Sequence, residues 1–147
     1  MLAWFAWLWF NPGPSPYRYQ LVEEGGVDKF SQLGLDAWPD LTIAKYDVFA
    51  EEIEKPLASG HTARRGQTPP VLISWENHTS ELIASVDSKL NELTTLAAAI
   101  DKYAGKDALI LGWWDTSRQI KLLASRDTLF NSHVGQPLLI IIFRNGT

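Results

Sequence analysis

The stretch that decides the predicted fold is VLISWENHTSELIASVDSKLNELTTLAAAIDKYAGKDALILGWW, residues 71–114. It opens with one short apolar run, VLISW, and closes with another, ALILGWW, and each has the length and composition of a buried strand. Between the two runs, apolar residues recur every three or four positions, which predicts an amphipathic helix that begins near Thr79 or Ser80 and ends near Gly105. Two such strands and a long helix are best joined as a right-handed parallel crossover.

The flanking segments extend this pattern. Residues 17–22 and 41–50 alternate or are rich in β-branched and aromatic side chains, which predicts two further strands. Asp115 is expected to cap a second helix, and PLLIIIF at 137–143 predicts another buried strand. The polar segment 51–70 is interpreted as a connection with at most a short helix. We therefore expect an α/β domain with a mostly parallel sheet and crossover helices, and an incomplete Rossmann-like domain is one form that this pattern allows.

The chain begins with an unbroken apolar run, MLAWFAWLWF, at residues 1–10. A transmembrane helix needs about 20 apolar residues, and a signal peptide carries basic residues ahead of its apolar core. We interpret the run as part of a truncated membrane anchor with its tryptophans at the interface, and an apolar first strand or core helix is the alternative. NPGPSP at 11–16 predicts a stiff linker, and the α/β domain then covers 17–147. Because RNGT ends the chain soon after the last predicted strand, we expect this domain to be incomplete at its carboxyl end.

Composition narrows the function classes. The net charge of -4 leaves no basic patch of the kind that nucleic acid requires, so nucleic acid is not an expected partner. The chain has no cysteine, which excludes thiolate metal sites, iron–sulfur clusters and CxxCH haem attachment. Glycine-rich nucleotide motifs and the GxSxG motif are also absent. The sequence therefore predicts no metal site and no cofactor of its own, and any redox role would depend on a bound or partner cofactor.

Two predicted strands end in similar chemistry, at Trp75-Glu76 and at Trp113-Trp114-Asp115. In open α/β sheets, ligands collect at the carboxyl ends of the strands, so these five residues are the candidate ligand-binding set. Capping is the role that we expect first for Asp115, because Thr116 and Ser117 follow it in the manner of a helix start. The alternative for the three tryptophans is core and rim packing, which explains Trp113 and Trp114 least well.

Two further candidate sites are weaker. His61, Arg64 and Arg65 could receive an anion, although a polar loop of this kind is more often only solvated. His78 lies two residues after Glu76 and could join an acid/base or metal site, although a lone histidine at a helix start is usually a surface residue.

Four segments together resemble the hydroxylamine oxidation protein HaoB family: LVEEGGVDKF, LGLDAWPDLTIAKYDVFA, PPVLISWEN and DALILGWWDTSRQIKLLASRDTLFNSHVGQPL. The resemblance spans most of residues 20–139. It implies a membrane-anchored protein that faces the periplasm and is encoded beside the octahaem hydroxylamine oxidoreductase of ammonia-oxidising bacteria. The family has no well-defined catalytic residues to carry over, so the resemblance implies a membrane partner and a multihaem protein partner and names no site.

A second, local resemblance concerns GWWDTSRQI, which is similar to the WWDxG-type motif of oligosaccharyltransferase catalytic subunits. The matching positions are Trp113, Trp114, Asp115, Gln119 and Ile120. Thr116 and Ser117 replace the tyrosine and glycine of that motif, and the polytopic membrane part of such enzymes is missing, so glycosyl transfer by this chain alone is not expected.

Two functions follow from these observations. The first is a membrane-tethered periplasmic accessory protein of hydroxylamine oxidation that assembles or contacts multihaem redox proteins. The second is a ligand-binding or glycosyltransferase-related α/β domain that uses the Trp/Asp cluster at the strand ends.

Overall fold

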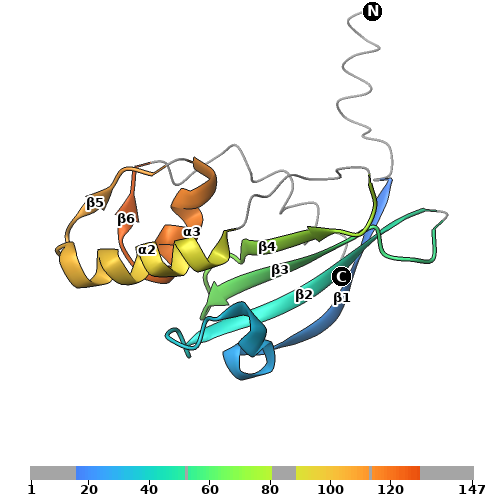
Figure 1. The fold of residues 1–147 in the computed structure, drawn as a ribbon, viewed down its shortest axis with the longest axis horizontal. Coiled ribbons are helices and arrows are strands. Elements are labelled where there is room, and N and C mark those ends of the chain that lie inside the picture. The colour runs from blue at the N-terminus through green and yellow to red at the C-terminus, as the bar shows by residue number, and fades with distance from the viewer. Residues whose placement is uncertain (1–15, 52, 81–88, 113, 130–147) are drawn as a thin grey trace, which may run out of the picture.

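The computed structural model describes residues 16–51, 53–80, 89–112 and 114–129, and it divides them between a long sheet and a smaller helical part (Figure 1). The elements in chain order are β1 (Tyr17–Gly26), the 3-10 helix η1 (Val27–Leu33), β2 (Leu41–Ala50), β3 (Ala58–Arg65), β4 (Val71–Asn77), α2 (Leu90–Tyr103), β5 (Leu109–Ile110), α3 (Trp114–Ala124) and β6 (Asp127–Thr128).

The main sheet has four strands in the order β1-β2-β3-β4, and each strand is antiparallel to its neighbour. Its register places Asp47 of β2 opposite Ser59 of β3, which in turn lies opposite Glu76 of β4. Two irregularities interrupt the ladder, one in β1 at Val22 and one between β3 and β4. Residues from the middle of the chain are therefore aligned in rows across the sheet.

The predicted mostly parallel sheet is wrong, because the main sheet is antiparallel throughout. Residues 66–70, which join β3 to β4, are too few for a parallel crossover, since such a connection takes about a dozen residues or more. The turn is tight: Gly66 has a φ of +57°, and the backbone N–H of Thr68 donates to the carbonyl of Arg65 at 3.1 Å. The Rossmann-like interpretation is therefore also wrong, because that fold requires a parallel sheet.

The segment that we interpreted as a connection, 51–70, contains β3, so that interpretation is also wrong. Its sequence, ASGHTARR, has one β-branched residue, two alanines and a glycine, which is a weak signal for a strand. It forms a strand because it lies between β2 and β4 and exchanges ladder hydrogen bonds with both. Tertiary pairing overrides local preference at this position.

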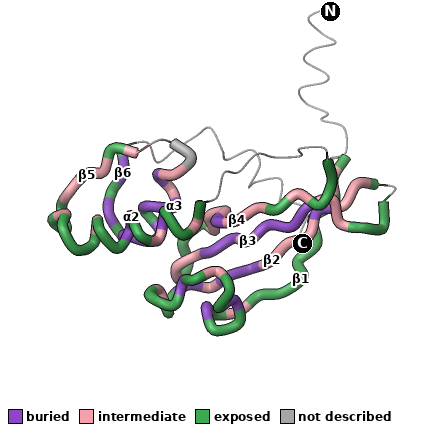
Figure 2. The backbone as a smooth tube through the Cα atoms, in the orientation of Figure 1, coloured by how far each residue is buried: buried purple, intermediate pink, exposed green. Residues whose placement is uncertain are grey.

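The helical part packs beside β4. Helix α3 contacts β4, and α2 contacts α3. The indole N–H of Trp38 donates to the carbonyl of Leu123 at 2.7 Å, and the side-chain amide of Gln119 donates to the carbonyl of Leu72 at 3.0 Å. Buried apolar residues from both parts form one core, which Figure 2 shows as the purple segments of the sheet and helices. The sheet contributes Leu41, Ile43, Ala63 and Ile73, and the helices contribute Ala97, Ile120, Leu122, Leu123 and Ala124.

The predicted helices are confirmed in part. Helix α2 ends at Tyr103 with Ala104 as its C-cap, one residue before the predicted terminator Gly105. Its predicted amino-terminal half includes residues 81–88, which lie outside the described residues. Helix α3 begins at Trp114, so Asp115 lies in its first turn and not at the N-cap position that we predicted.

A small parallel unit is the part of the α/β prediction that the structure retains. β5 and β6 pair in parallel over two residues each, and α3 is the crossover between them. The strand predicted over ALILGWW is therefore much shorter than expected. PLLIIIF at 137–143 lies outside the described residues, as do the apolar run at 1–10 and most of the linker at 11–16.

Within the described ranges, no helix is both long enough and apolar enough to cross a membrane.

Arg126 joins the carboxyl ends of the two helices. Its guanidinium donates to the carbonyl of Gly105 at 3.0 Å and to that of Ala124 at 3.0 Å. It also donates to the Asp101 carboxylate at 3.2 Å and to the Ala104 carbonyl at 3.4 Å. The last backbone carbonyls of a helix lack hydrogen-bond donors within the helix. The buried guanidinium donates to carbonyls that would otherwise be buried without a partner.

Candidate functional site

The carboxyl end of β4 carries two of the predicted site residues, Trp75 and Glu76. Successive side chains of a strand point to opposite faces, so these two residues do not share a face of the sheet. The indole N–H of Trp75 donates to the side-chain oxygen of Asn77 at 3.0 Å. Its ring lies against Gly60 of β3, where an added Cβ would be 3.0 Å from the ring. Trp75 is therefore a half-buried packing residue whose orientation depends on a glycine in the next strand.

Three polar side chains meet at the same end of the sheet, one from β2, one from β3 and one from the residue that follows β4. The Ser59 hydroxyl lies 2.6 Å from Asp47 Oδ1 and 2.8 Å from His78 Nε2. The backbone N–H of His78 donates to the carbonyl of Leu57 at 2.7 Å, which extends the β3–β4 pairing past the end of β4. Ser59 is 7% exposed, so its hydroxyl is a buried link between an aspartate and an exposed histidine. We call Asp47, Ser59 and His78 the polar chain.

The direction of hydrogen bonding determines what the polar chain can do. A carboxylate can only accept hydrogen bonds, so the Ser59 hydroxyl donates a hydrogen bond to Asp47. The Nε2–H of His78 then donates a hydrogen bond to the Ser59 oxygen. In a nucleophilic triad the serine donates to the histidine, and the carboxylate holds the other nitrogen of that histidine. In the polar chain the serine, and not the histidine, is the middle group, and its hydroxyl donates to the aspartate. Its geometry suits a structural connection of three strands and does not activate Ser59 as a nucleophile.

His61 lies two positions after Ser59 in β3, opposite Lys45 on one side and Ser74 on the other. Its ring packs edge-on against Phe30, with 5.8 Å between the ring centroids. Burial first, and then the Lys45 ammonium, lower the pKa of His61, and the carboxylates of Asp47 and Glu76 act in the opposite direction. His61 is therefore favoured in its neutral form.

The two arginines that we considered as anion ligands are paired with carboxylates. Arg64 lies 2.9 Å from Glu24 of β1, and Arg65 lies 2.6 Å from Asp40. Arg65 also donates to the hydroxyl of Ser125. The Arg64 guanidinium thus links β3 to β1, and the Arg65 guanidinium links β3 to the loop before β2.

The expected meeting of the two strand ends does not occur in one sheet, because β4 belongs to the four-stranded sheet and β5 to the two-stranded one. Trp113 lies outside the described residues. Trp114 and Asp115 form the first turn of α3, and only their backbone is described. Ligand binding by the five predicted residues stays a prediction.

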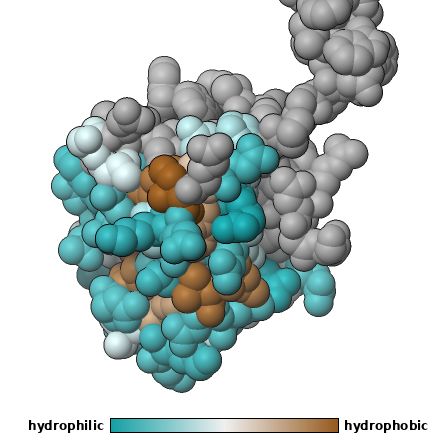
Figure 3. Space-filling model, turned by 90° about the vertical axis from the view of Figure 1, so that its right-hand side faces the viewer, coloured by the Kyte–Doolittle hydropathy of each residue, from teal (hydrophilic) through white to brown (hydrophobic). Residues whose placement is uncertain are grey.

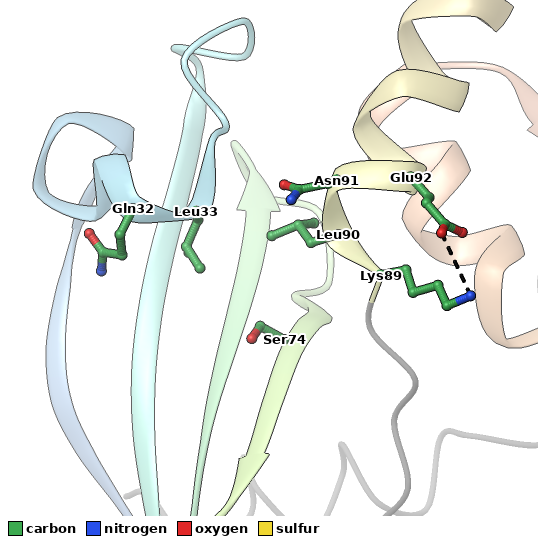
Figure 4. A pocket seen from close by; sticks show the side chains of 7 residues that line it. All are labelled: Gln32, Leu33, Ser74, Lys89, Leu90, Asn91 and Glu92. Atoms are coloured by element: carbon green, nitrogen blue, oxygen red, sulfur yellow. Dashed lines mark ion pairs between the residues drawn. The ribbon is translucent and has the colours of Figure 1, made fainter.

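A hollow of about 380 Å³ lies between η1, β4 and the start of α2 (Figure 4). Lys89 and Glu92 pair with each other beside it at 3.6 Å. The residues around the hollow are Gln32, Leu33, Ser74, Lys89, Leu90, Asn91 and Glu92. The sequence offered no signal for this hollow, since its residues come from three distant segments. Among the described residues, no group of three or more histidine, aspartate or glutamate side chains is arranged to hold a metal ion.

The end of the sheet that holds the polar chain is on the side of the molecule seen in Figure 3. The surface there is mostly hydrophilic, with smaller hydrophobic areas between the polar side chains (Figure 3). Sequence reasoning identified His78 as a weak candidate and missed Asp47 and Ser59. A correct β3 with its register would have revealed both, because the two residues lie directly opposite each other.

The comparison with protein families identifies the chain. A family model described as HaoA-associated protein HaoB matches residues 1–142. The chain belongs to this family. The resemblance to HaoB read from the sequence is thus confirmed, and family membership indicates an accessory role in hydroxylamine oxidation.

No curated protein and no solved structure matches the chain. The local similarity of GWWDTSRQI to oligosaccharyltransferases finds no support in these comparisons, whereas the HaoB model includes that segment.

Proposed function

We propose that this HaoB-family chain is a membrane-tethered accessory protein that binds HaoA, a multihaem protein, and assists hydroxylamine oxidation on the periplasmic side of the inner membrane. The observation that carries the proposal is the family match over residues 1–142, with its description as HaoA-associated. The cysteine-free sequence supports a division of labour, because this chain cannot attach haem through CxxCH or hold an iron–sulfur cluster. The electrons would then be carried by the haem protein, and this chain would assemble or contact it.

The tether in this proposal is the apolar run at residues 1–10, followed by the proline-rich linker at 11–16. Tryptophans in such a run favour the membrane interface, and a proline-rich spacer keeps the folded part away from the bilayer. Membrane fractionation of the full chain and of a variant lacking residues 1–12 tests this part. The full chain should sediment with membranes and the shortened chain should not; equal sedimentation of both would refute the tether.

Two experiments test the accessory role itself. Affinity purification of the full chain from its own organism should recover HaoA, detected by its haem absorbance. A clean gene deletion should reduce hydroxylamine-dependent oxygen uptake, and the full-length gene should restore it in the same strain. Unchanged oxygen uptake in the deletion strain would refute the accessory role, and recovery of no haem protein would refute the contact with HaoA.

A further inference from the structure

The two long edges of the main sheet differ in how they are covered. At the β4 edge, α3 packs against the strand, and the buried amide of Gln119 donates to the Leu72 carbonyl at 3.0 Å. That edge is blocked by the protein's own helix. At the other edge, β1 pairs with β2 on its inner side, and the described residues place no strand or helix along its outer side at residues 18–22.

Most side chains of β1 are exposed, as expected for a strand whose outer edge no described element covers, and the strand is drawn largely in green in Figure 2. Leu21 and Val22 are 48% and 51% exposed, so two neighbouring apolar side chains lie at the open edge. Open edge strands offer a row of backbone donors and acceptors to any extended segment that reaches them, and proteins usually protect them. The bulge at Val22 bends the strand but leaves the five residues before it, 17–21, in regular pairing with β2.

The two glutamates of β1 are paired within the chain, whereas the exposed Arg18 lies over the Phe49 ring, 5.6 Å from its centroid. Glu23 lies 3.6 Å from Lys29, and Glu24 lies 2.9 Å from Arg64. A partner strand would meet the Arg18 guanidinium within residues 18–22, and otherwise backbone pairing and apolar contact are the interactions that this edge offers. Addition of a strand to a sheet edge is an established mode of protein recognition that uses these two contributions.

We propose that an extended segment of HaoA pairs with the outer edge of β1 at residues 18–22 and covers Leu21 and Val22, which adds a fifth strand to the sheet. This inference rests on the proposed function, since HaoA is taken as the partner from the family description.

The test measures binding of purified HaoA, with its haems, to the full chain and to two edge variants, Leu21→Lys and Val22→Lys. A charged lysine on an edge strand opposes pairing, and both side chains are exposed enough for the fold to accept it, which circular dichroism checks. The matched control is Leu111→Lys, whose 73% exposed leucine lies just after β5 in the helical part. Each edge variant should weaken binding at least about tenfold, and the control should bind like the unchanged chain. Hydrogen exchange should show the amides of residues 18–22 becoming protected when HaoA is added.

The outcomes separate the two proposals. If the unchanged chain does not bind HaoA, both the contact with HaoA and the edge inference are refuted. If it binds HaoA but the edge variants bind equally well and β1 amides gain no protection, the edge inference alone is refuted. If the chain forms a dimer by itself and Leu21→Lys converts it to a monomer, a second copy is the occupant and the assignment to HaoA is overturned.

Discussion

Replacing Arg126 by methionine should lower the free energy of unfolding by about 3 kcal/mol. The side chain is 7% exposed, and its guanidinium donates to two backbone carbonyls at 3.0 Å, those of Gly105 and Ala124. A hydrogen bond from a charged donor contributes roughly 1.5–3 kcal/mol, and unsatisfied buried acceptors carry their own cost. The ion pair with Asp101 adds little, because that carboxylate is 72% exposed. Two strong donations and one weak ion pair together give the estimate.

Urea denaturation followed by circular dichroism measures the change, and the melting temperature should fall by roughly 10 °C for a chain of this size. Arg126→Lys should lie between methionine and the unchanged protein, because an ammonium keeps the charge but cannot reach all the carbonyls at once. Arg64→Met is the control, since it removes an arginine from an ion pair exposed on both sides and should cost less than about 1 kcal/mol. If Arg126→Met is no more destabilising than Arg64→Met, the role assigned to the buried guanidinium is refuted.

Three further predictions concern the main sheet. Gly60→Ala should destabilise the fold by roughly 1 kcal/mol and alter tryptophan fluorescence, because the added Cβ meets the Trp75 ring at 3.0 Å; unchanged stability and fluorescence would contradict that packing. Ser59→Ala should cost about 1 kcal/mol in urea denaturation, since it breaks the buried link of the polar chain, and a Ser59→Ala protein as stable as the original would show that the link contributes nothing. Burial lowers the pKa of His61 below 6.5, so below that pH the unfolded chain binds a proton before the folded chain does, and stability should fall as the pH falls from 6.5 through the lowered pKa. His61→Gln should reduce this slope in denaturation curves recorded across that range, and an identical slope in the variant would contradict the assignment.

Elements whose pattern is strong within their own segment were predicted from the sequence. The alternation in 17–22 and the β-branched and aromatic residues of 41–50 correspond to β1 and β2, and VLISW corresponds to most of β4. The apolar periodicity before Tyr103 corresponds to α2, because one stripe of that helix faces the core. Each of these patterns lies within one continuous segment, so the strand or helix that it predicts does not depend on distant residues.

The direction of the sheet was not predictable in this way. A parallel and an antiparallel arrangement of β4 use the same apolar residues, and the choice between them depends on the short turn at residues 66–70 and on a strand, β3, with little β-propensity of its own. Without β3, the sequence offers β4 no antiparallel neighbour, and the long helix predicted after β4 then favours a parallel crossover.

The candidate site shows the same limit. Trp75 and Glu76 were recognised because they stand together in the sequence, whereas Asp47, Ser59 and His78 come together only through cross-strand register. A shift of one residue in the pairing of β2 with β3 would move Ser59 to the other face of the sheet and break the polar chain.

The sequence alone determined the family, the absence of cysteine chemistry and the position of the elements with strong periodicity, because each of these depends on residue identity along a continuous stretch. The tertiary structure decided which strands are neighbours, which sheet edge α3 covers, which edge no other described element covers, and which polar side chains meet. These properties depend on contacts between residues far apart in the chain, and such contacts form only when the whole core is assembled.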